Sequence, residues 1–287
     1  MRVHTFIALL LLAAHARAGD FGSDFAVVMI DDATETKLGP FPYDRAIYAK
    51  AIDACARLKA KAVVLKFFFD LPKSADGDAA LAAAMKKIPV ALQARLEPTE
   101  GTAQSIPPRF RFGDKPLPAA ERGELGWIPL PALLDSAAAV AFVDFDGPVI
   151  PLVEEYRGAP YKSLVLCCLE MTTGAQARVE PGKIFVGQGW LPVDGKNVFH
   201  SELGQLEPLQ PISFASLLAG DVKPEAVAGR VVIIGWDSQR TDTLPTKLGP
   251  MGIHRLFVQC LVLAHRQLNA SQQPPAPARA APPPRTG

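Results

Sequence analysis

The sequence predicts an α/β fold, in which a mixed, largely parallel sheet is flanked by helices and interrupted by a long proline-rich excursion. Short apolar runs of strand length alternate along the chain with segments whose apolar residues recur at helical spacing. This alternation favours parallel strands, because each helix carries the chain back to the same end of the sheet. The 287 residues are 49% hydrophobic and 21% charged, which is typical of a globular protein.

The first strand and the first helix are marked by clear local signals. The apolar run 25–30 predicts a buried strand, which ends at the acidic pair Asp31-Asp32. A turn at 39–43 follows, and Asp44 is the expected cap of a helix. One face of this helix is marked by apolar residues at positions 47, 48, 51, 52, 55 and 58.

The other elements are predicted from apolar runs of strand length, from helical spacing of apolar residues and from turn residues. Residues 97–131 are rich in proline and in charges of both signs, so we expect a long excursion with little regular structure. A turn is expected at Asp146-Gly147. The remaining expected strands cover 62–69, 90–94, 137–145, 183–186 and 231–235, with a hairpin at Asp194-Gly195 within 191–198, and the remaining helices cover 78–87, 161–172, 213–220 and 253–268.

Both ends of the chain differ in composition from the domain between them, which we expect to span residues 19–268. Residues 1–18 join a basic start to a short apolar run and to Ala16-Arg17-Ala18, which offers small residues at the two positions that a signal peptidase inspects. A membrane anchor is the alternative, but the run is shorter than the roughly 20 apolar residues of a membrane span. Residues 269–287 are mostly Ala, Pro, Gln and Arg, which predicts a disordered tail.

The charge of the chain argues against two classes of partner. The formal net charge is +1, and loss of Arg2 and Arg17 with the signal peptide would leave acidic and basic side chains nearly equal in number. A nucleic-acid-binding protein, or one that docks on anionic lipid, needs an excess of basic side chains. No stretch after residue 18 has the length and apolarity of a membrane span. We therefore expect a periplasmic or secreted protein that binds no nucleic acid and is not membrane-spanning after signal removal.

The four cysteines are Cys55, Cys167, Cys168 and Cys260. In an oxidising compartment four cysteines allow three complete disulfide connectivities. The first three lie within apolar helical patterns, so we expect most of the cysteines to be small buried side chains. The sequence has no CxxC or HxxxH spacing, and we expect neither a metal nor a cofactor.

Polar residues follow two of the expected strands, at the edge where α/β folds place ligand sites. Neighbouring strand residues point to opposite faces, so only one of Asp31 and Asp32 can easily face a site; it binds a cation or a ligand amine, or it caps the following turn. Arg45 either holds an anion or forms a structural ion pair with one of these aspartates, and the ion pair is the favoured interpretation. The candidate ligand-binding residues are Asp31, Asp32, Arg45, Asp237, Arg240 and Asp242.

Several short motifs occur in a recognisable order. The first half contains Ile30-Asp31-Asp32 and Gly39-Pro-Phe-Pro-Tyr-Asp-Arg45. The second half contains Ile212-Ser-Phe-Ala-Ser-Leu-Leu-Ala-Gly220, Gly229-Arg-Val-Val-Ile-Ile-Gly235, Asp242-Thr-Leu-Pro-Thr246 and Gly252-Ile-His254. Together they resemble the CHASE type-2 family, extracytoplasmic sensory domains of bacterial adenylate cyclases, diguanylate cyclases, and histidine or serine/threonine kinases. The likeness runs from about residue 25 to residue 268.

The resemblance implies a ligand-sensing module that recognises an unknown small molecule or envelope cue. It implies no catalytic residues, and it implies action through a partner such as an envelope or membrane signalling protein. Lys66 departs from the family pattern, which often has an aspartate at that position. The family typically continues into transmembrane helices and a cytoplasmic enzyme, whereas this sequence continues into its proline-rich segment, so we expect no output domain.

Two other functions stay open from the sequence. A structural or interaction protein of the envelope could use the proline-rich tail as a tether or recognition segment. Asp144-Phe-Asp146-Gly resembles the nucleophile motif of haloacid-dehalogenase phosphatases, in which one carboxylate attacks phosphorus, the other acts as acid or base, and magnesium neutralises the phosphate. Pro148 stands where that motif has Thr or Val, and the string lies mid-chain instead of opening the fold.

Overall fold

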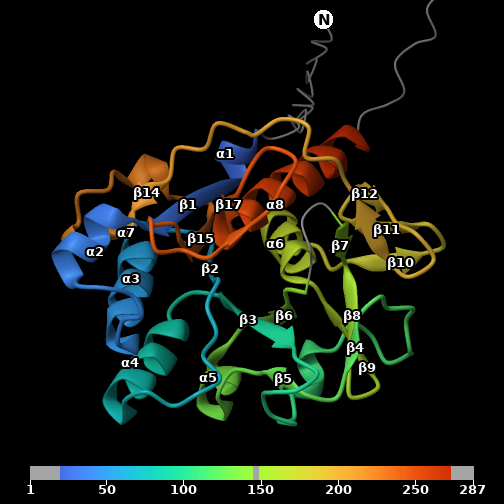
Figure 1. Ribbon diagram of the computed structural model, residues 1–287, viewed down its shortest axis with the longest axis horizontal. Coiled ribbons are helices and arrows are strands. Elements are labelled where there is room, and N and C mark those ends of the chain that lie inside the picture. Colours follow the sequence, from blue (N-terminus) through green and yellow to red (C-terminus); the bar gives the residue numbers. More distant parts are fainter. Residues whose placement is uncertain (1–19, 145–148, 273–287) are drawn as a thin grey trace, which may run out of the picture.

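The computed structural model describes residues 20–144 and 149–272. Its centre is a sheet of parallel strands in the spatial order β14-β1-β15-β2-β3-β6, and one short antiparallel strand, β5, pairs with the end of β3 (Figure 1). The strands are β1 (Phe25–Ile30), β2 (Ala62–Leu65), β3 (Val90–Leu96), β5 (Gly126–Trp127), β6 (Ala139–Phe142), β14 (Ile212–Ser213) and β15 (Val231–Trp236). The predicted α/β class, with a mixed, largely parallel sheet flanked by helices, is confirmed.

The central strands are apolar on both faces because helices cover both faces of the sheet. In β1, Val28 and Ile30 pack into one hydrophobic cluster, whereas Val27 and Met29 pack into the other. Strand residues alternate between the two faces, so a strand without polar residues supplies both layers at once. This is the reason that β1, β2 and β15 appear in the sequence as continuous apolar runs.

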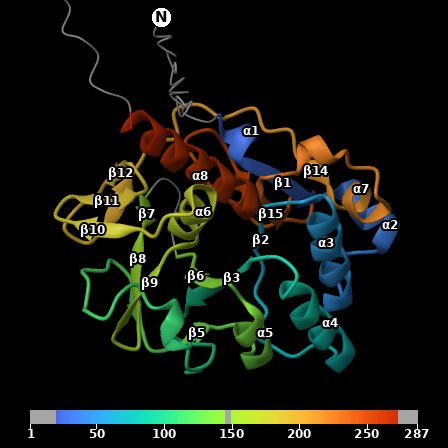
Figure 2. The same cartoon turned by 180° about the vertical axis from the view of Figure 1, so that it is seen from behind.

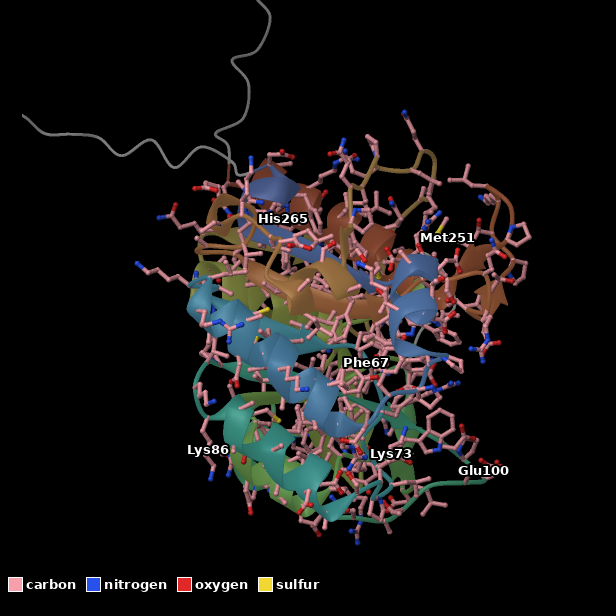
Figure 3. All side chains as sticks on the ribbon, turned by 90° about the vertical axis from the view of Figure 1, so that its left-hand side faces the viewer. Phe67, Lys73, Lys86, Glu100, Met251 and His265 are labelled. Carbon is pink, nitrogen blue, oxygen red and sulfur yellow. The ribbon has the colours of Figure 1, made fainter. Side chains whose placement is uncertain are left out.

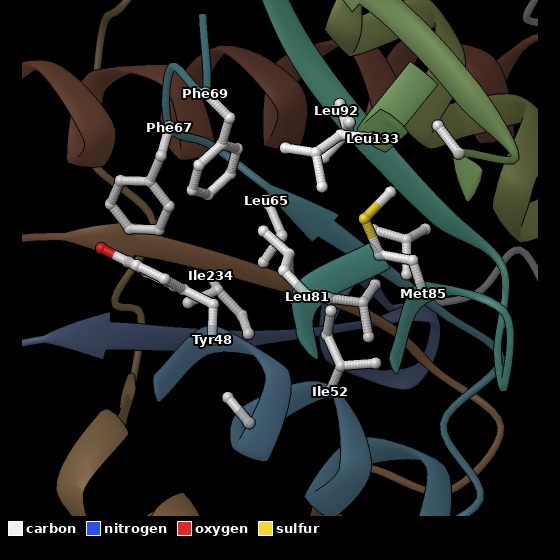
Figure 4. Packing of buried hydrophobic residues seen from close by; sticks show 14 of the residues in the cluster. Tyr48, Ile52, Leu65, Phe67, Phe69, Leu81, Met85, Leu92, Leu133 and Ile234 are labelled. Atoms are coloured by element: carbon white, nitrogen blue, oxygen red, sulfur yellow. The ribbon is translucent and has the colours of Figure 1, made fainter. Parts of the chain in front are cut away.

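One face of the sheet is covered by α3 (Arg45–Arg57), α4 (Ala75–Met85), α5 (Pro131–Ser136) and α7 (Phe214–Ala219). Asp44 caps α3 by accepting a hydrogen bond from the Ala46 N–H at 2.8 Å, and its other oxygen accepts one from the hydroxyl of Ser74, the cap of α4, at 2.5 Å. The starts of the two helices are thereby joined. Tyr48 and Ile52 of α3 and Leu81 and Met85 of α4 point at Leu65, Leu92 and Ile234 of the sheet (Figure 4).

The other face is covered by α6 (Leu164–Thr173) and α8 (Ile253–Ala270), with the single turn α1 (Phe21–Asp24) packed against β1 and α8 (Figure 2). Ser163 caps α6, and Gly174 ends it in the left-handed conformation that favours glycine. Cys167 and Cys168 lie in α6 and Cys260 lies in α8, whereas Cys55 lies in α3. All four cysteines are buried and form no disulfide, as expected for most of them.

Short sheets extend the molecule beside the central sheet; they are antiparallel except that β4 pairs with β8 in parallel (Figure 1). The sheet β10-β11-β12 contacts α6 and α8 through its last two strands. The members of these sheets are β4 (Arg122–Gly123), β7 (Val149–Pro151), β8 (Val153–Tyr156), β9 (Ala159–Lys162), β10 (Arg178–Glu180), β11 (Lys183–Val186), β12 (Gly189–Pro192), β13 (Val198–His200), β16 (Thr243–Leu244) and β17 (Met251–Gly252). The excursion 97–131 holds, besides β4 and β5, one 3-10 turn, η1 (Pro108–Phe110).

Several element boundaries differ from those the sequence predicts. The second strand ends at Leu65, four residues early, and the helix expected from 161 begins at Leu164 because 161 and 162 pair in β9. No hairpin forms at Asp194-Gly195, since β12 pairs with β11 and β13 pairs with β7. The helix α2 (Asp32–Leu38) and η2 (Pro224–Ala226) were not expected, and α8 runs to Ala270.

The expected signal peptide (1–18), the turn at Asp146-Gly147 and most of the expected tail lie outside the described residues. Within the part of the chain that the structure describes, no helix combines the length and the apolar character needed to cross a bilayer.

Candidate functional site

A groove of about 1070 Å³ opens at the carboxyl-terminal edge of the parallel strands. Its floor is formed by residues at or just after the ends of β2, β3, β6 and β15, among them Lys66, Arg95 and Trp236. In the side view, Phe67 lies near the centre, with Met251 of β17 above it and Lys73 below it (Figure 3). Leu244 and Ile253 line the groove on the β16–β17 side, and residues 71–73 line it on the other side.

Aromatic side chains form two walls of the groove. On one side, the ring of Phe41 stacks on Trp236 with centroids 4.5 Å apart and lies 5.5 Å from the ring of Phe67. On the other side, Phe68 meets Trp127 edge to face at 4.8 Å. Four of these five rings are only partly buried, so they offer planar apolar surface to the groove.

Lys66 is the most unusual group on the floor of the groove. Its residue is only 5% exposed, and among the described residues its ammonium has no ion pair or hydrogen bond; the ammonium lies 5.2 Å from the centroid of the Phe257 ring in α8. Burial, and then the charge of Arg95, lower the pKa of Lys66 from 10.5 to about 7. A buried ammonium without a partner raises the free energy of the folded protein. This position therefore favours a negatively charged group.

Two more polar groups on the floor lack partners. Gln93, on β3 beside Lys66, is 2% exposed and its Oε1 accepts no hydrogen bond. His254, at the start of α8, has a buried Nδ1 without a partner, because that nitrogen faces the backbone of Gly235. A Cβ at Gly235 would lie 3.1 Å from Nδ1, so the close approach of α8 to β15 favours glycine there. Burial, and then the charge of Lys66, hold the pKa of His254 well below its usual value, and the ring is neutral.

Asp144, which lines the groove, is coupled to a second buried acid, Glu154. Asp144 accepts a hydrogen bond from the Leu96 N–H at 2.9 Å and lies 3.5 Å from Nε of Arg95, whose guanidinium covers the ring of Trp127. Burial raises the pKa of Asp144, against the lowering effects of these contacts and of Glu154. Burial, and then Asp144, raise the pKa of Glu154 well above its usual value. Both oxygens of Glu154 lack a donor, and protonation resolves this because a neutral carboxyl can donate to Asp144.

The comparison with protein families identifies the chain. The model of the CHASE2 domain matches residues 6–284, nearly the whole sequence. The chain belongs to the CHASE2 domain family. This is a family of extracytoplasmic sensory domains, so the resemblance read from the motifs is confirmed. No curated protein and no solved structure matches the chain.

Two of the six candidate ligand-binding residues of this CHASE2 domain, Arg45 and Asp242, line the groove. Arg45 is buried and forms an ion pair at 2.5 Å, but its partner is Asp78 of α4, not one of the strand-end aspartates. Its guanidinium also donates to the carbonyl of Leu71 and lies over the ring of Phe69. The ion pair expected for Arg45 is therefore present with a different acid. Asp242 is exposed at the rim of the groove.

The strand-end aspartates, which also belong to the predicted set, bond to neighbouring chain segments. Asp31 caps α2, because its Oδ1 accepts hydrogen bonds from the Thr34 N–H at 2.8 Å and from the Ser213 hydroxyl at 3.0 Å. Asp32 accepts a hydrogen bond from the Gln239 N–H at 3.0 Å, which ties the end of β1 to the loop after β15. The cap, one of the two interpretations of the aspartate pair, is thus realised by Asp31.

The loop after β15 carries the last two predicted residues. Asp237 pairs with Arg255 of α8 at 2.6 Å, and Arg240 lies 3.4 Å from Glu35 of α2. The structure brings the two strand ends together, since the Asp237 N–H donates to the carbonyl of Ile30 at 3.0 Å. The side chains of Asp237 and Arg240 therefore join the loop after β15 to α8 and α2.

Sequence reasoning missed the groove residues Lys66 and Gln93, and it missed Glu154, the buried acid coupled to Asp144. Lys66 and Gln93 each carried a signal, because each is a polar residue within an otherwise apolar strand run. Glu154 carried none, since it follows an apolar stretch in a sequence with many scattered acids. Asp144 of the phosphatase-like string is described and Asp146 is not; among the described residues no three His, Cys, Asp or Glu side chains gather as a metal site.

Proposed function

We propose that this CHASE2 domain is a ligand-binding sensory module whose receptor site is the groove at the carboxyl-terminal edge of its sheet. The observation that carries the proposal is a groove of about 1070 Å³ whose floor holds the unpaired Lys66 and the unbonded Oε1 of Gln93. A buried polar group without a partner costs about 1–3 kcal/mol, and more when it is charged. A bound ligand that supplies the missing partners would recover this energy, which gives affinity and selectivity together.

The six residues predicted from the sequence have two roles in this proposal. Arg45 and Asp242 belong to the lining of the groove, where they can contact a ligand. Asp32 and Arg240 join the loop after β15 to α2, Asp237 joins this loop to α8, and Asp31 joins the start of α2 to Ser213 of β14. Ligand binding would then affect the loop that joins β15 to α8, and α8 is the longest helix of the described chain. In this way occupancy of the groove would reach a partner protein of the envelope or membrane.

We also propose that residues 1–18 direct export and that the mature protein is periplasmic or secreted. The support is the pattern of a basic start, a short apolar run and small residues before position 19. N-terminal sequencing of the protein recovered from the periplasmic fraction is expected to begin at Gly19. Recovery of the intact N-terminus in the membrane fraction would show an anchor instead.

The groove is tested by a ligand screen on the purified protein. A library of metabolites, sugars, nucleotides and organic acids is added and the melting temperature is measured; a ligand at 100 times its Kd should stabilise the fold by about 2.7 kcal/mol. A matched pair of variants then locates the site. Leu71 and Leu206 are both exposed, but only Leu71 lines the groove. Leu71→Trp is expected to change the affinity for a hit, whereas Leu206→Trp is expected to leave it unchanged. A flat screen on folded protein would refute the receptor and favour the interaction protein.

A further inference from the structure

Every Lys and Arg side chain of the described lining except one has an ion pair or a hydrogen-bond partner. Arg45 is paired with Asp78, Arg95 with Asp144, and the ammonium of Lys73 donates to the carbonyls of Pro42 and Tyr43 at 3.0 Å. Lys66 is the basic side chain of the described lining that has no such partner, and it is also the most deeply buried lysine of the lining. The groove therefore has a single deep position that favours a negative charge.

The rim of the groove limits how much negative charge a ligand can carry. Asp70, Glu121 and Asp242 line the groove, and each is at least partly exposed to solvent. These carboxylates would repel a second or third negative charge near the mouth. The arrangement of one deep cation below several rim acids selects a monoanion over a polyphosphate or a nucleotide.

The walls indicate the shape of the rest of the ligand. Phe41 and Trp236 on one side and Phe68 and Trp127 on the other present partly buried ring surfaces. Leu71, at 68% exposed, adds apolar surface at the mouth. Ring faces of this kind favour a flat apolar body that stacks on them. The free acceptor of Gln93 adds a requirement for one hydrogen-bond donor on the ligand.

We infer that the groove binds an organic monoanion, namely a carboxylate on a flat, largely apolar body with one N–H or O–H donor, whose carboxylate pairs with Lys66. The inference rests on the proposed ligand-binding function and names the class of its ligand. The carboxylate would supply the partner that Lys66 lacks, the donor would reach Gln93, and the flat body would lie between the aromatic walls.

The test compares probes that share a skeleton and differ in charge. Indole-3-acetate, indole-3-acetamide and tryptamine form one series, and phenylacetate, phenylacetamide and phenethylamine form the other. Binding to the protein is measured by calorimetry at about pH 6.5, where Lys66 is mostly protonated. In each series we expect the carboxylate to bind about tenfold or more tightly than the amide and the amine. The indole series is expected to bind more tightly than the phenyl series, because it carries the donor for Gln93.

Variants assign the preference to Lys66. Lys66→Met should reduce the affinity for the carboxylate to that of the amide, Lys66→Arg should keep the preference, and Lys86→Met, at an exposed lysine outside the groove, should change nothing.

Wild-type protein gives a second test that involves no mutation. The affinity for the carboxylate, but not for the amide, should fall as the pH rises from about 6 to about 8.5, because Lys66 loses its proton. The groups that face Lys66 are Arg95 on β3 and His254 and Cys260 on α8. The pKa of His254 lies well below its usual value and burial raises the pKa of Cys260 to about 12, so neither group should titrate in that range.

The possible results distinguish failure of the inferred ligand class from failure of the proposed ligand-binding function. Equal or tighter binding of the amide or amine would overturn the ligand class and leave the groove as a receptor. A hit from the broad screen that carries no negative charge, or several, would overturn the class in the same way. A flat result with every probe and with the broad library, on protein that melts cooperatively, would overturn both proposals.

Discussion

Replacement of Lys66 by methionine should stabilise the ligand-free protein, although it removes a charged residue from the floor of the groove. Lys66 is buried just after the end of β2, and among the described residues no acid pairs with it. Methionine has a similar length and places an apolar group in the same space. A buried charge that is replaced by an apolar side chain of similar volume commonly gives a more stable protein.

The size of the effect follows from the pKa of Lys66, which falls from 10.5 to about 7 on folding. At about 1.4 kcal/mol per pH unit, the lowered pKa of Lys66 reduces the free energy of unfolding by roughly 4 kcal/mol at pH 7 and by roughly 2 kcal/mol at pH 9. Between about pH 7 and pH 10.5 the unfolded chain holds this proton and the folded chain does not, so this contribution to stability rises with pH; below about pH 7 both states hold it and the whole penalty is present. Structural relaxation reduces these values, so we expect a gain of about 2–4 kcal/mol at pH 7 and about half of that at pH 9.

The measurement is urea unfolding followed by tryptophan fluorescence, on wild type and variant, at pH 7 and pH 9. The two proteins are compared at each pH, because the buried thiols, whose pKa values burial raises, lower the stability of both proteins alike above about pH 9. Lys86→Met, on the exposed end of α4, is the control and should shift the free energy of unfolding by less than about 0.5 kcal/mol.

Two results would refute this reasoning. If Lys66→Met is less stable than the wild type at pH 7, the ammonium has a partner that stabilises it in the folded protein. If the gain is the same at pH 7 and pH 9, the lysine does not lose its proton in this range, and burial does not depress its pKa.

Three further predictions concern other buried groups. The pKa of Glu154 is raised, so the unfolded chain loses this proton at lower pH than the folded chain. Wild type should therefore lose stability relative to Glu154→Gln as the pH rises above about 4.5. The control variant Glu155→Gln, at the next residue, which is partly exposed, should not show this dependence in circular-dichroism melts. Gly235→Ala should destabilise the fold by about 1–3 kcal/mol in urea, because the added methyl group would press on His254, and an unchanged midpoint would contradict this packing. The four buried cysteines should react with a thiol reagent only on unfolding, whereas reaction of native protein within seconds would contradict their burial.

Local patterns in the sequence were sufficient for most of the fold. The strand at 25–30, the cap at Asp44 and the end of α7 at Gly220 were predicted because each depends on its own residues: an apolar run, a carboxylate before a helix, and a glycine in the left-handed conformation. The boundaries of α6 could not be predicted in the same way. Tyr161 continues the apolar helical pattern, and only its pairing with β8 places it in a strand.

The candidate site depended on contacts that local pattern cannot reveal. The sequence alone determined that acids and an arginine would gather at the carboxyl ends of β1 and β15, because parallel strands share that edge. Only the tertiary structure decided that β15 lies between β1 and β2, that Arg45 pairs with an acid 33 positions away, and that Lys66 lies beside the unbonded Oε1 of Gln93. The order and register of the strands are set by long-range packing of both faces at once. The partners and the burial of Arg45, Lys66 and Gln93 are therefore fixed only when the whole sheet has formed.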